Sequence, residues 1–320
     1  MNRALTMDNE RTSLDEMLQT ELGRADALVG SLGGILRHLL ANDDHSMFSD
    51  EIIARLRGMI ANLAQQLLFA RARAANVDNP ASQSDDDRAA LEDLLLSHLP
   101  LLGHVHAVAL EFQLTSRLEH RQSIDPVLTP LVQSLVASPD GGTANAAMAA
   151  LAAQARFMQQ QRRMELPLAE LPGDLFHSAV LALRSLSGEQ ADPSAERASE
   201  TLRKGFDESS SRVGLLSRLV MGLGSEAARA LEIEHAGVAF FVTALGIASG
   251  QDRDLAILST NDRQTVRLAL SLRAAGVKPE AIAEQFAFIH PAIALPADFG
   301  RLRNDRACEL LAASNADIGG

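Results

Sequence analysis

The stretch 231–290 constrains the fold of this chain more than any other. Residues 236–248 are apolar on nearly every side, which is typical of a helix buried all round. Residues 264–290 then predict a helical hairpin, with Gly276 in the turn and Pro279 at the first position of the second helix. We therefore expect a helical core here, in which the buried side chains include Phe240, Phe241, Leu245, Phe286 and Ile289.

The composition extends the helical prediction to the whole chain. Its 320 residues are 47% hydrophobic and 22% charged, and they include no Trp and no Tyr. Leu and Ala dominate, and these are strong helix formers, whereas strands favour β-branched and aromatic residues. We expect an all-α protein with one large domain or two modest ones.

Two heptad seams near the N-terminus predict two long helices that pair with each other. Apolar residues recur at alternating spacings of four and three on both sides of a polar turn near residues 41–48. Because the loop is short, we expect an antiparallel helical hairpin over residues 11–76. The first seam comprises Leu18, Leu22, Ala25, Val29, Leu32, Leu36 and Leu39, and the second comprises Ile53, Leu56, Ile60, Leu63, Leu67, Ala70 and Ala74.

Residues 77–87 (VDNPASQSDDD) have the composition of a solvated linker between this hairpin and a multi-helical body over residues 88–315. Within the body, Asp192 and Pro193 predict the cap and the first residue of a helix that reaches about Phe206. Helix pairs of roughly 35 to 50 residues recur without a repeating residue pattern. The body is therefore either an irregular multi-helix bundle or α-solenoid-like.

Apolar residues beside the two seams favour self-association through the hairpin. Leu28, Ile35, Ile52 and Met59 have no obvious cover when only two helices pair. A second hairpin would cover them and form a four-helix bundle, so we expect a homodimer. The alternative is that the hairpin folds back on its own body.

Charge limits the partners that this chain can bind. The formal net charge is -12, which disfavours nucleic acids and anionic membranes. The densest basic cluster is Arg156 with Arg162 and Arg163, followed by Arg71 with Arg73. Solvated helix faces are the usual explanation of such clusters, and an acidic partner or a self-interface is the alternative.

Other features predict a cytoplasmic protein. The N-terminal sequence has no apolar core of a secretory signal, and the longest apolar run, of about 14 residues, is shorter than a membrane span. The single cysteine, Cys308, excludes an internal disulfide and a cysteine-based zinc site within one chain.

The histidines keep a catalytic or metal-binding hypothesis open. His98, His104 and His106 are close in sequence, and Glu111 follows them. Residues two apart on a helix point away from each other, so His104 and His106 do not converge on one ion. We interpret the three as surface or core-edge histidines.

The hairpin 264–290 also has the outline of a DNA-binding helix-turn-helix. A DNA-reading helix presents Arg, Lys, Asn or Gln, whereas this helix offers Glu280, Glu284 and Gln285 after Lys278. An ordinary helical hairpin is the better interpretation.

No catalytic, cofactor-binding or metal-binding motif is present in the sequence. The leading hypothesis is therefore a cytoplasmic helical interaction or regulatory protein, such as a scaffold or adaptor, that binds protein partners and self-associates. The alternatives are a DNA-binding regulator that uses 264–290, and an enzyme or metal-binding protein that uses His98, His104 and His106.

Overall fold

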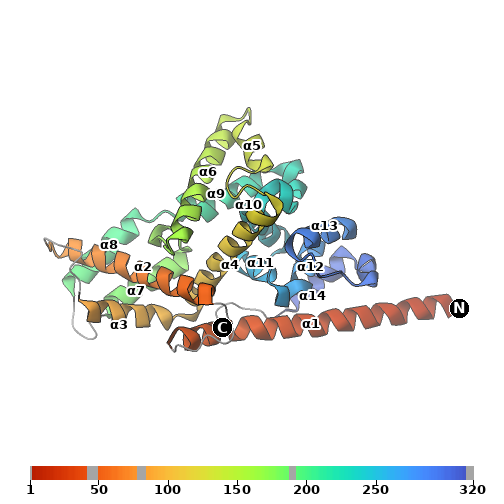
Figure 1. The fold of residues 1–320 in the computed structure, drawn as a ribbon, viewed down its shortest axis with the longest axis horizontal. Helices are drawn as coiled ribbons and strands as arrows, with labels where there is room; N and C mark the ends of the chain where they lie inside the picture. Colours follow the sequence, from red (N-terminus) through yellow and green to blue (C-terminus); the bar gives the residue numbers. More distant parts are fainter. Residues whose placement is uncertain (1, 42–49, 78–83, 187–191, 315–320) are drawn as a thin grey trace. The chain divides into compact units, whose positions relative to one another are not determined.

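A computed structural model describes the chain except residues 1, 42–49, 78–83, 187–191 and 315–320, and in α1 it describes only the backbone of residues 2–13, 39 and 41. Every regular element of the described part is a helix, which confirms the all-α prediction (Figure 1). The α-helices are α1 (Asn2–Ala41), α2 (Asp50–Ala74), α3 (Asp85–Leu96), α4 (Leu99–Gln122), α5 (Pro130–Val136), α6 (Gly141–Arg162), α7 (Gly173–Ser185), α8 (Pro193–Gly205), α9 (Arg212–Gly222), α10 (Ile233–Ser249), α11 (Arg253–Ser259), α12 (Thr265–Ala274), α13 (Pro279–Ile289) and α14 (Asn304–Ala312). The 3-10 helices are η1 (Leu168–Glu170), η2 (Glu208–Ser210), η3 (Gly224–Leu231), η4 (Asp262–Gln264) and η5 (Ala297–Arg301).

Contacts divide the chain into two compact units that differ from the predicted domains. Unit 1 comprises Met1–Leu32, Gln113–Ala147 and Leu216–Ile318, and the rest of the chain forms unit 2. The division falls inside helices. Of the predicted linker 77–87, residues 78–83 lie outside the described residues, and residues 85–87 already belong to α3. Local polarity marks loops, whereas compact units depend on contacts between distant segments, so the sequence pattern does not reveal this division.

In unit 1, α10 is the central helix. It packs against α5, η3, α11, α12 and α13, which explains why it is apolar on nearly every side. The prediction of a buried core is confirmed: exposure does not exceed 4% for Phe240, Phe241, Leu245, Phe286 and Ile289.

A break near its start distinguishes α10 from the continuous helix expected over residues 236–248. Gly237 has φ 72° and ψ 168°, a conformation that is open essentially only to glycine. Thr129 packs against the break, where its hydroxyl donates to the Ala236 carbonyl at 3.1 Å. A Cβ at position 237 would lie 2.5 Å from Cγ2 of Thr129, so the break also permits a close approach.

The part of α1 in unit 1 buries its predicted seam. Polar contacts join this helix to the C-terminal part of the same unit: the Gln264 side chain donates to the Ala25 carbonyl at 2.9 Å, and Arg267 pairs with Asp26. Arg306 pairs with Asp15 at 2.9 Å. The seam is buried at Leu18, Leu22, Ala25, Val29 and Leu32 and, in unit 2, at Leu36, while the side chain of Leu39 lies outside the described residues.

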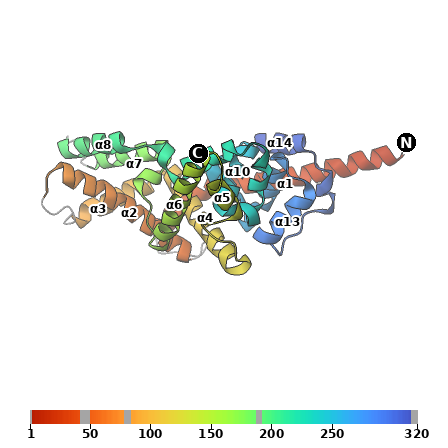
Figure 2. The same ribbon diagram turned by 90° about the horizontal axis from the view of Figure 1, so that it is seen from above.

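In unit 2, α2 packs against α3, α7 and α8, and these four helices lie together in both ribbon views (Figures 1 and 2). The seam of α2 is buried from Ile53 to Leu67, and Ala70 and Ala74 are half-buried near its end. Asp192 caps α8, which begins at Pro193 as predicted.

No helix of the described residues is by itself long and apolar enough to cross a membrane. Two pairs of helices joined by a sharp bend, α3 with α4 and η3 with α10, are long and apolar enough when each pair is taken together, by length and composition only.

Candidate functional site

A groove on unit 2 has the size and lining of a binding site. Its volume is about 850 Å³, within the usual range for ligand sites. It runs between α2 and α8, with the Pro167 segment and α7 completing its walls. The lining residues are Gln65, Gln66, Phe69, Ala70, Arg73, Ala74, Pro167, Leu168, Ala169, Phe176, Ala198, Thr201, Leu202, Gly205 and Phe206.

Small residues are buried on α8, which packs against α2 and α7. Ala195, Ala198 and Ser199 are buried, and their short side chains allow two helices to approach closely. The Ser199 hydroxyl donates to the Ala195 carbonyl at 2.7 Å, so its polar atom is satisfied within its own helix. Of these three residues, Ala198 lines the groove.

Two side chains of α2 hold the segment that closes one side of the groove. The Gln66 amide donates to the Leu166 carbonyl at 2.8 Å and accepts from the Leu168 backbone N–H at 3.0 Å. The Asn62 side chain accepts from the Leu166 N–H at 3.1 Å. These bonds satisfy backbone groups of a non-repetitive segment and fix it against α2.

Three phenylalanine rings line the groove. Phe176 and Phe206 stack with ring centroids 4.0 Å apart and planes 8° from parallel. Phe69 is 43% exposed, which is a large exposure for an aromatic side chain in a groove. Gln65, Phe69 and Arg73 follow one another at spacings of four along α2, so they share one face of the helix.

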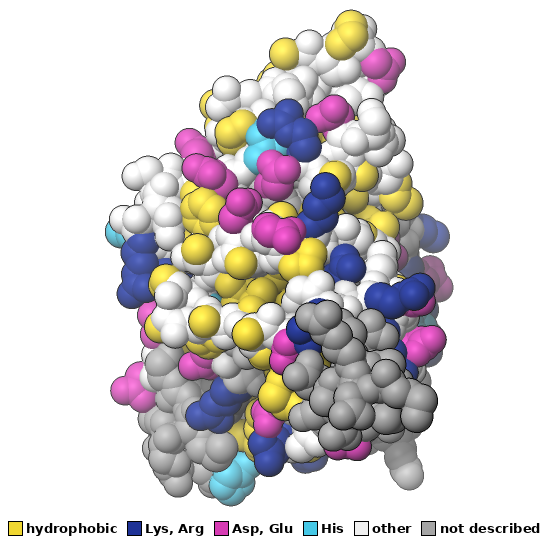
Figure 3. Space-filling view, turned by 90° about the vertical axis from the view of Figure 1, so that its right-hand side faces the viewer, with side chains coloured by type: hydrophobic (Ala, Val, Ile, Leu, Met, Phe, Trp, Pro, Cys, Tyr) yellow, Lys and Arg dark blue, Asp and Glu magenta, His cyan; other side chains and the backbone are white. Residues whose placement is uncertain are grey.

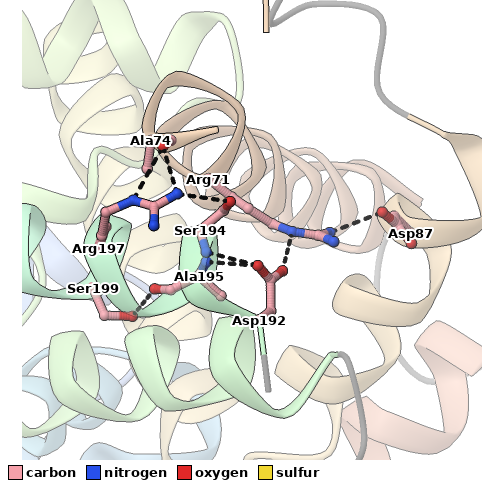
Figure 4. Close-up of polar contacts among 8 residues, drawn as sticks. All are labelled: Arg71, Ala74, Asp87, Asp192, Ser194, Ala195, Arg197 and Ser199. Atoms are coloured by element: carbon pink, nitrogen blue, oxygen red, sulfur yellow. Dashed lines mark hydrogen bonds and ion pairs between the residues drawn. The ribbon is translucent and has the colours of Figure 1, made fainter. Parts of the chain in front are cut away.

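An ion network fixes one end of the groove (Figure 4). Arg71 pairs with Asp192 at 2.7 Å and with Asp87 at 2.9 Å. Arg197 donates to the Ala74 carbonyl at 3.1 Å, which satisfies an acceptor at the C-terminus of α2. The start of α8 is thereby tied to the last turn of α2.

Asp192 is held ionised in this network. Burial opposes its ionisation, but the backbone N–H groups of Ala195 and Ser194, together with Arg71, outweigh burial and lower the pKa of Asp192. The charged carboxylate therefore caps α8 and pairs with Arg71 at neutral pH.

Arg73 is the only charged residue among the described residues that line the groove. Its guanidinium lies 5.7 Å from the centroid of the Phe69 ring, within reach of a cation–π interaction. The groove thus combines an apolar surface with one positive charge and no negative charge.

The residues predicted to form an interaction surface differ in how exposed they are. Ile52 and Met59, expected to lack cover, are buried within unit 2 at 4% and 0% exposure, so the expected exposure is wrong for both. The Gln161 side chain contacts the Met59 sulfur at 3.4 Å, which accounts for part of that cover. Leu28 is 39% exposed, and Ile35 is half-buried.

The predicted basic cluster does lie on the surface. Arg156, Arg162 and Arg163 are all exposed on or just after α6, and Arg163 lies 3.9 Å from Glu165. Arg71 and Arg73 have separate surroundings, because Arg71 is paired with carboxylates and Arg73 faces the groove.

His98, His104 and His106 do not come together as a metal site. His104 and His106 are buried at 5% and 4% exposure, so the expectation of surface or core-edge positions is wrong for them. Burial lowers the pKa of His106 to about 4. His98 is half-buried, and its Nδ1 accepts from the Leu101 N–H at 3.2 Å. No group of three or more metal-ligating side chains converges among the described residues.

Glu111, which follows the histidines in sequence, belongs to a buried ion pair instead. Arg212 donates to both its carboxylate oxygens at 2.7 and 2.8 Å and to the Gln154 side chain at 3.1 Å. The Arg212 guanidinium also lies 3.8 Å from the centroid of the Phe157 ring. These contacts stabilise the packing of unit 2.

The hairpin 264–290 forms as α12 and α13, with Gly276 in the turn at φ 86°. Gln285, expected on the exposed face, is buried and accepts from the Ile233 N–H at 2.8 Å. The exposed polar residues on and before α13 are Lys278, Glu280 and Glu284. On the face drawn in Figure 3, Lys and Arg side chains lie among Asp and Glu side chains, with hydrophobic ones between them.

The sequence prediction missed the groove, although one signal for it was present. Phe69 is a large apolar residue off the buried seam of α2, between Leu67 and Ala70. An off-seam aromatic residue has no cover in a two-helix pairing, and here it lines the groove.

Comparisons with models of protein families, with curated proteins and with solved structures find no match to this chain.

Proposed function

We propose that this protein is a cytoplasmic adaptor that binds an apolar helical segment of a partner protein in the α2–α8 groove. The observation that carries the proposal is the groove itself, which has a volume of about 850 Å³ and a largely apolar lining that includes the half-exposed ring of Phe69. Exposed apolar patches bounded by polar residues are typical of protein interaction sites.

The architecture favours a helix as the bound segment. A bound strand pairs its backbone with a sheet edge, and the described residues contain no strand. An amphipathic helix instead lays one apolar face into a groove, with anchors at i, i+3 or i+4, and i+7. The walls formed by α2 and α8 suit this mode.

The polar lining favours binding over catalysis. It comprises the side chains of Gln65, Gln66, Arg73 and Thr201, without a histidine, cysteine or carboxylate among the described lining residues. General acid–base or nucleophilic catalysis relies chiefly on such groups. Gln66 is also already used, since it holds the Leu166 segment.

Selection from a displayed library of random peptides tests the proposal. Peptides of about 16 residues are long enough to form a helix on binding. Binders are selected with the wild-type chain and counter-selected with Thr201→Trp, which fills the groove from an exposed position. We expect binders with apolar residues at helical spacing, whose affinity falls at least about tenfold in Phe69→Ala.

The matched control is Leu181→Ala, which truncates an exposed apolar residue of unit 2 outside the groove. It should leave peptide affinity unchanged, and circular dichroism should show that all variants remain helical. Binders that bind Thr201→Trp and Phe69→Ala as tightly as the wild type would refute the groove as the site.

Self-association through α1 is a second proposal, and it also has an observation in its favour. Met17 and Leu28 are 43% and 39% exposed and lie eleven residues apart, which is close to three helical turns. They therefore share one flank of α1 and could contact the same flank of a second copy.

A further inference from the structure

Arg73 gives the groove a preference for one sign of charge, an inference that rests on the function proposed above. Arg73 is exposed, belongs to the last turn of α2 and lines the groove beside Phe69. Within the described part of the chain its guanidinium contacts an aromatic ring but forms no ion pair. Its charge is therefore open to a ligand.

The two neighbouring arginines differ from Arg73. Arg71 is neutralised by Asp192 and Asp87, and Arg197 is bonded to the Ala74 carbonyl (Figure 4). These two hold the walls of the groove together. Arg73 lies on the same turn of α2, but among the described residues no such ion pair or backbone hydrogen bond is formed by its side chain.

The positions on α2 set the spacing that a ligand must match. Phe69 and Arg73 are one turn apart, or about 6 Å along the helix axis. We propose that the partner segment is an amphipathic helix in which an apolar residue covers Phe69 and a carboxylate, one turn away, pairs with Arg73. An Asp or Glu four residues from the apolar anchor has this spacing in a helix that runs along α2.

Desolvation of the Arg73 guanidinium strengthens the preference for an acidic segment. A helix that covers Phe69 also removes water from the adjacent guanidinium, and this costs free energy unless a carboxylate replaces the water. A lysine or arginine at the same position would add repulsion. Acidic segments are therefore favoured over neutral ones, and neutral segments over basic ones.

The acidic character of the whole chain does not cancel this preference. The formal net charge of -12 repels an acidic segment at long range. At physiological salt, however, charges more than about 8 Å apart are largely screened, whereas Arg73 would be in direct contact with the ligand. The net charge slows association, and the local contact determines which segment stays bound.

Charge exchange between protein and peptide tests the inference. The probe is a synthetic peptide from the selection described above, with Glu, Gln or Lys at the position one turn from its apolar anchor. Fluorescence anisotropy should show that Glu→Lys in the peptide weakens wild-type binding at least about tenfold, and that Arg73→Glu reverses this order. Arg156→Glu, an exposed arginine outside the groove, is the control and should preserve the wild-type order.

The outcomes separate this inference from the proposed function. Groove-dependent peptides whose affinity is equal for Glu, Gln and Lys would overturn the charge preference and leave the adaptor function standing. Failure to select any groove-dependent peptide would overturn both. Sodium dodecanoate is tested in parallel, and groove binding tighter than that of every selected peptide would identify a lipid carboxylate as the occupant and overturn the peptide ligand. Restored binding in the exchanged pair, Arg73→Glu with the Lys peptide, supports the inference.

Discussion

The buried imidazole of His106 links the stability of the fold to pH. Burial lowers its pKa to about 4 from the ordinary histidine value of 6.5. Between these values the unfolded chain binds a proton that the folded chain does not, so the free energy of unfolding falls as pH falls. From pH 7.5 to 5 the loss is about 2 kcal/mol. His106→Gln should remove this loss. The measurement is the difference in unfolding free energy between pH 7.5 and pH 5, obtained from urea denaturation.

The exposed His177 provides the control for this measurement. His177→Gln should leave the difference in unfolding free energy between the two pH values as it is in the wild type. A His106→Gln variant with an unchanged pH dependence would show that another group is responsible.

Burial is the residue property that the sequence predicted least well. Helical periodicity places His104 and His106 on different faces of α4, but it does not show that both faces are covered. The partner of Glu111 is similarly invisible, because Arg212 is 101 residues away in the chain. Exposure depends on which distant segments pack against a helix, and a single sequence does not record that.

At the scale of elements, local signals were sufficient to place several helix ends and turns. Asp192 and Pro193 begin α8, and Gly276 turns between α12 and α13. Each of these is a short-range preference of backbone and side chain, so the residues themselves carry it. The break at Gly237 was not predicted, because a glycine inside an apolar run is compatible with a continuous helix as well as with a break. Thr129, which packs against the break, lies 108 residues earlier in the chain.

The break in α10 predicts a penalty for any side chain at position 237. Gly237→Ala places a Cβ at φ 72° and 2.5 Å from Cγ2 of Thr129, so both backbone strain and a steric clash oppose it. We expect a loss of about 2 to 4 kcal/mol in unfolding free energy, measured by urea denaturation. Thr129→Ser keeps the hydroxyl but removes the methyl group, and should recover only the steric part.

Gly250→Ala serves as a comparison, because Gly250 also has a positive φ, 70°, but a Cβ there would meet no atom within 4 Å. Its loss should be about 1 kcal/mol. Equal losses at Gly237 and Gly250 would contradict a role for the contact with Thr129.

At the scale of the whole molecule, the seams predicted that helices need partners but not which partners they find. The burial of Leu18 and Leu22 was predictable from their spacing. The contacts of this part of α1 with Gln264, Arg267 and Arg306 were not, because these residues lie more than 200 positions further along the chain. An amphipathic stripe is compatible with any apolar surface of matching shape, so the division into compact units emerges only in three dimensions.

Burial within the chain sharpens the prediction of self-association, because only part of the expected interface is exposed. Ile52 and Met59 are buried, so a dimer that forms through α1 must use the flank that carries Met17 and Leu28. Leu28→Glu would place a charge in the centre of that contact and should convert a dimer into a folded monomer in sedimentation equilibrium at tens of micromolar. Ala27→Glu adds the same charge at the neighbouring exposed position and should leave the dimer intact. A wild-type chain that is already monomeric at this concentration would refute self-association through α1.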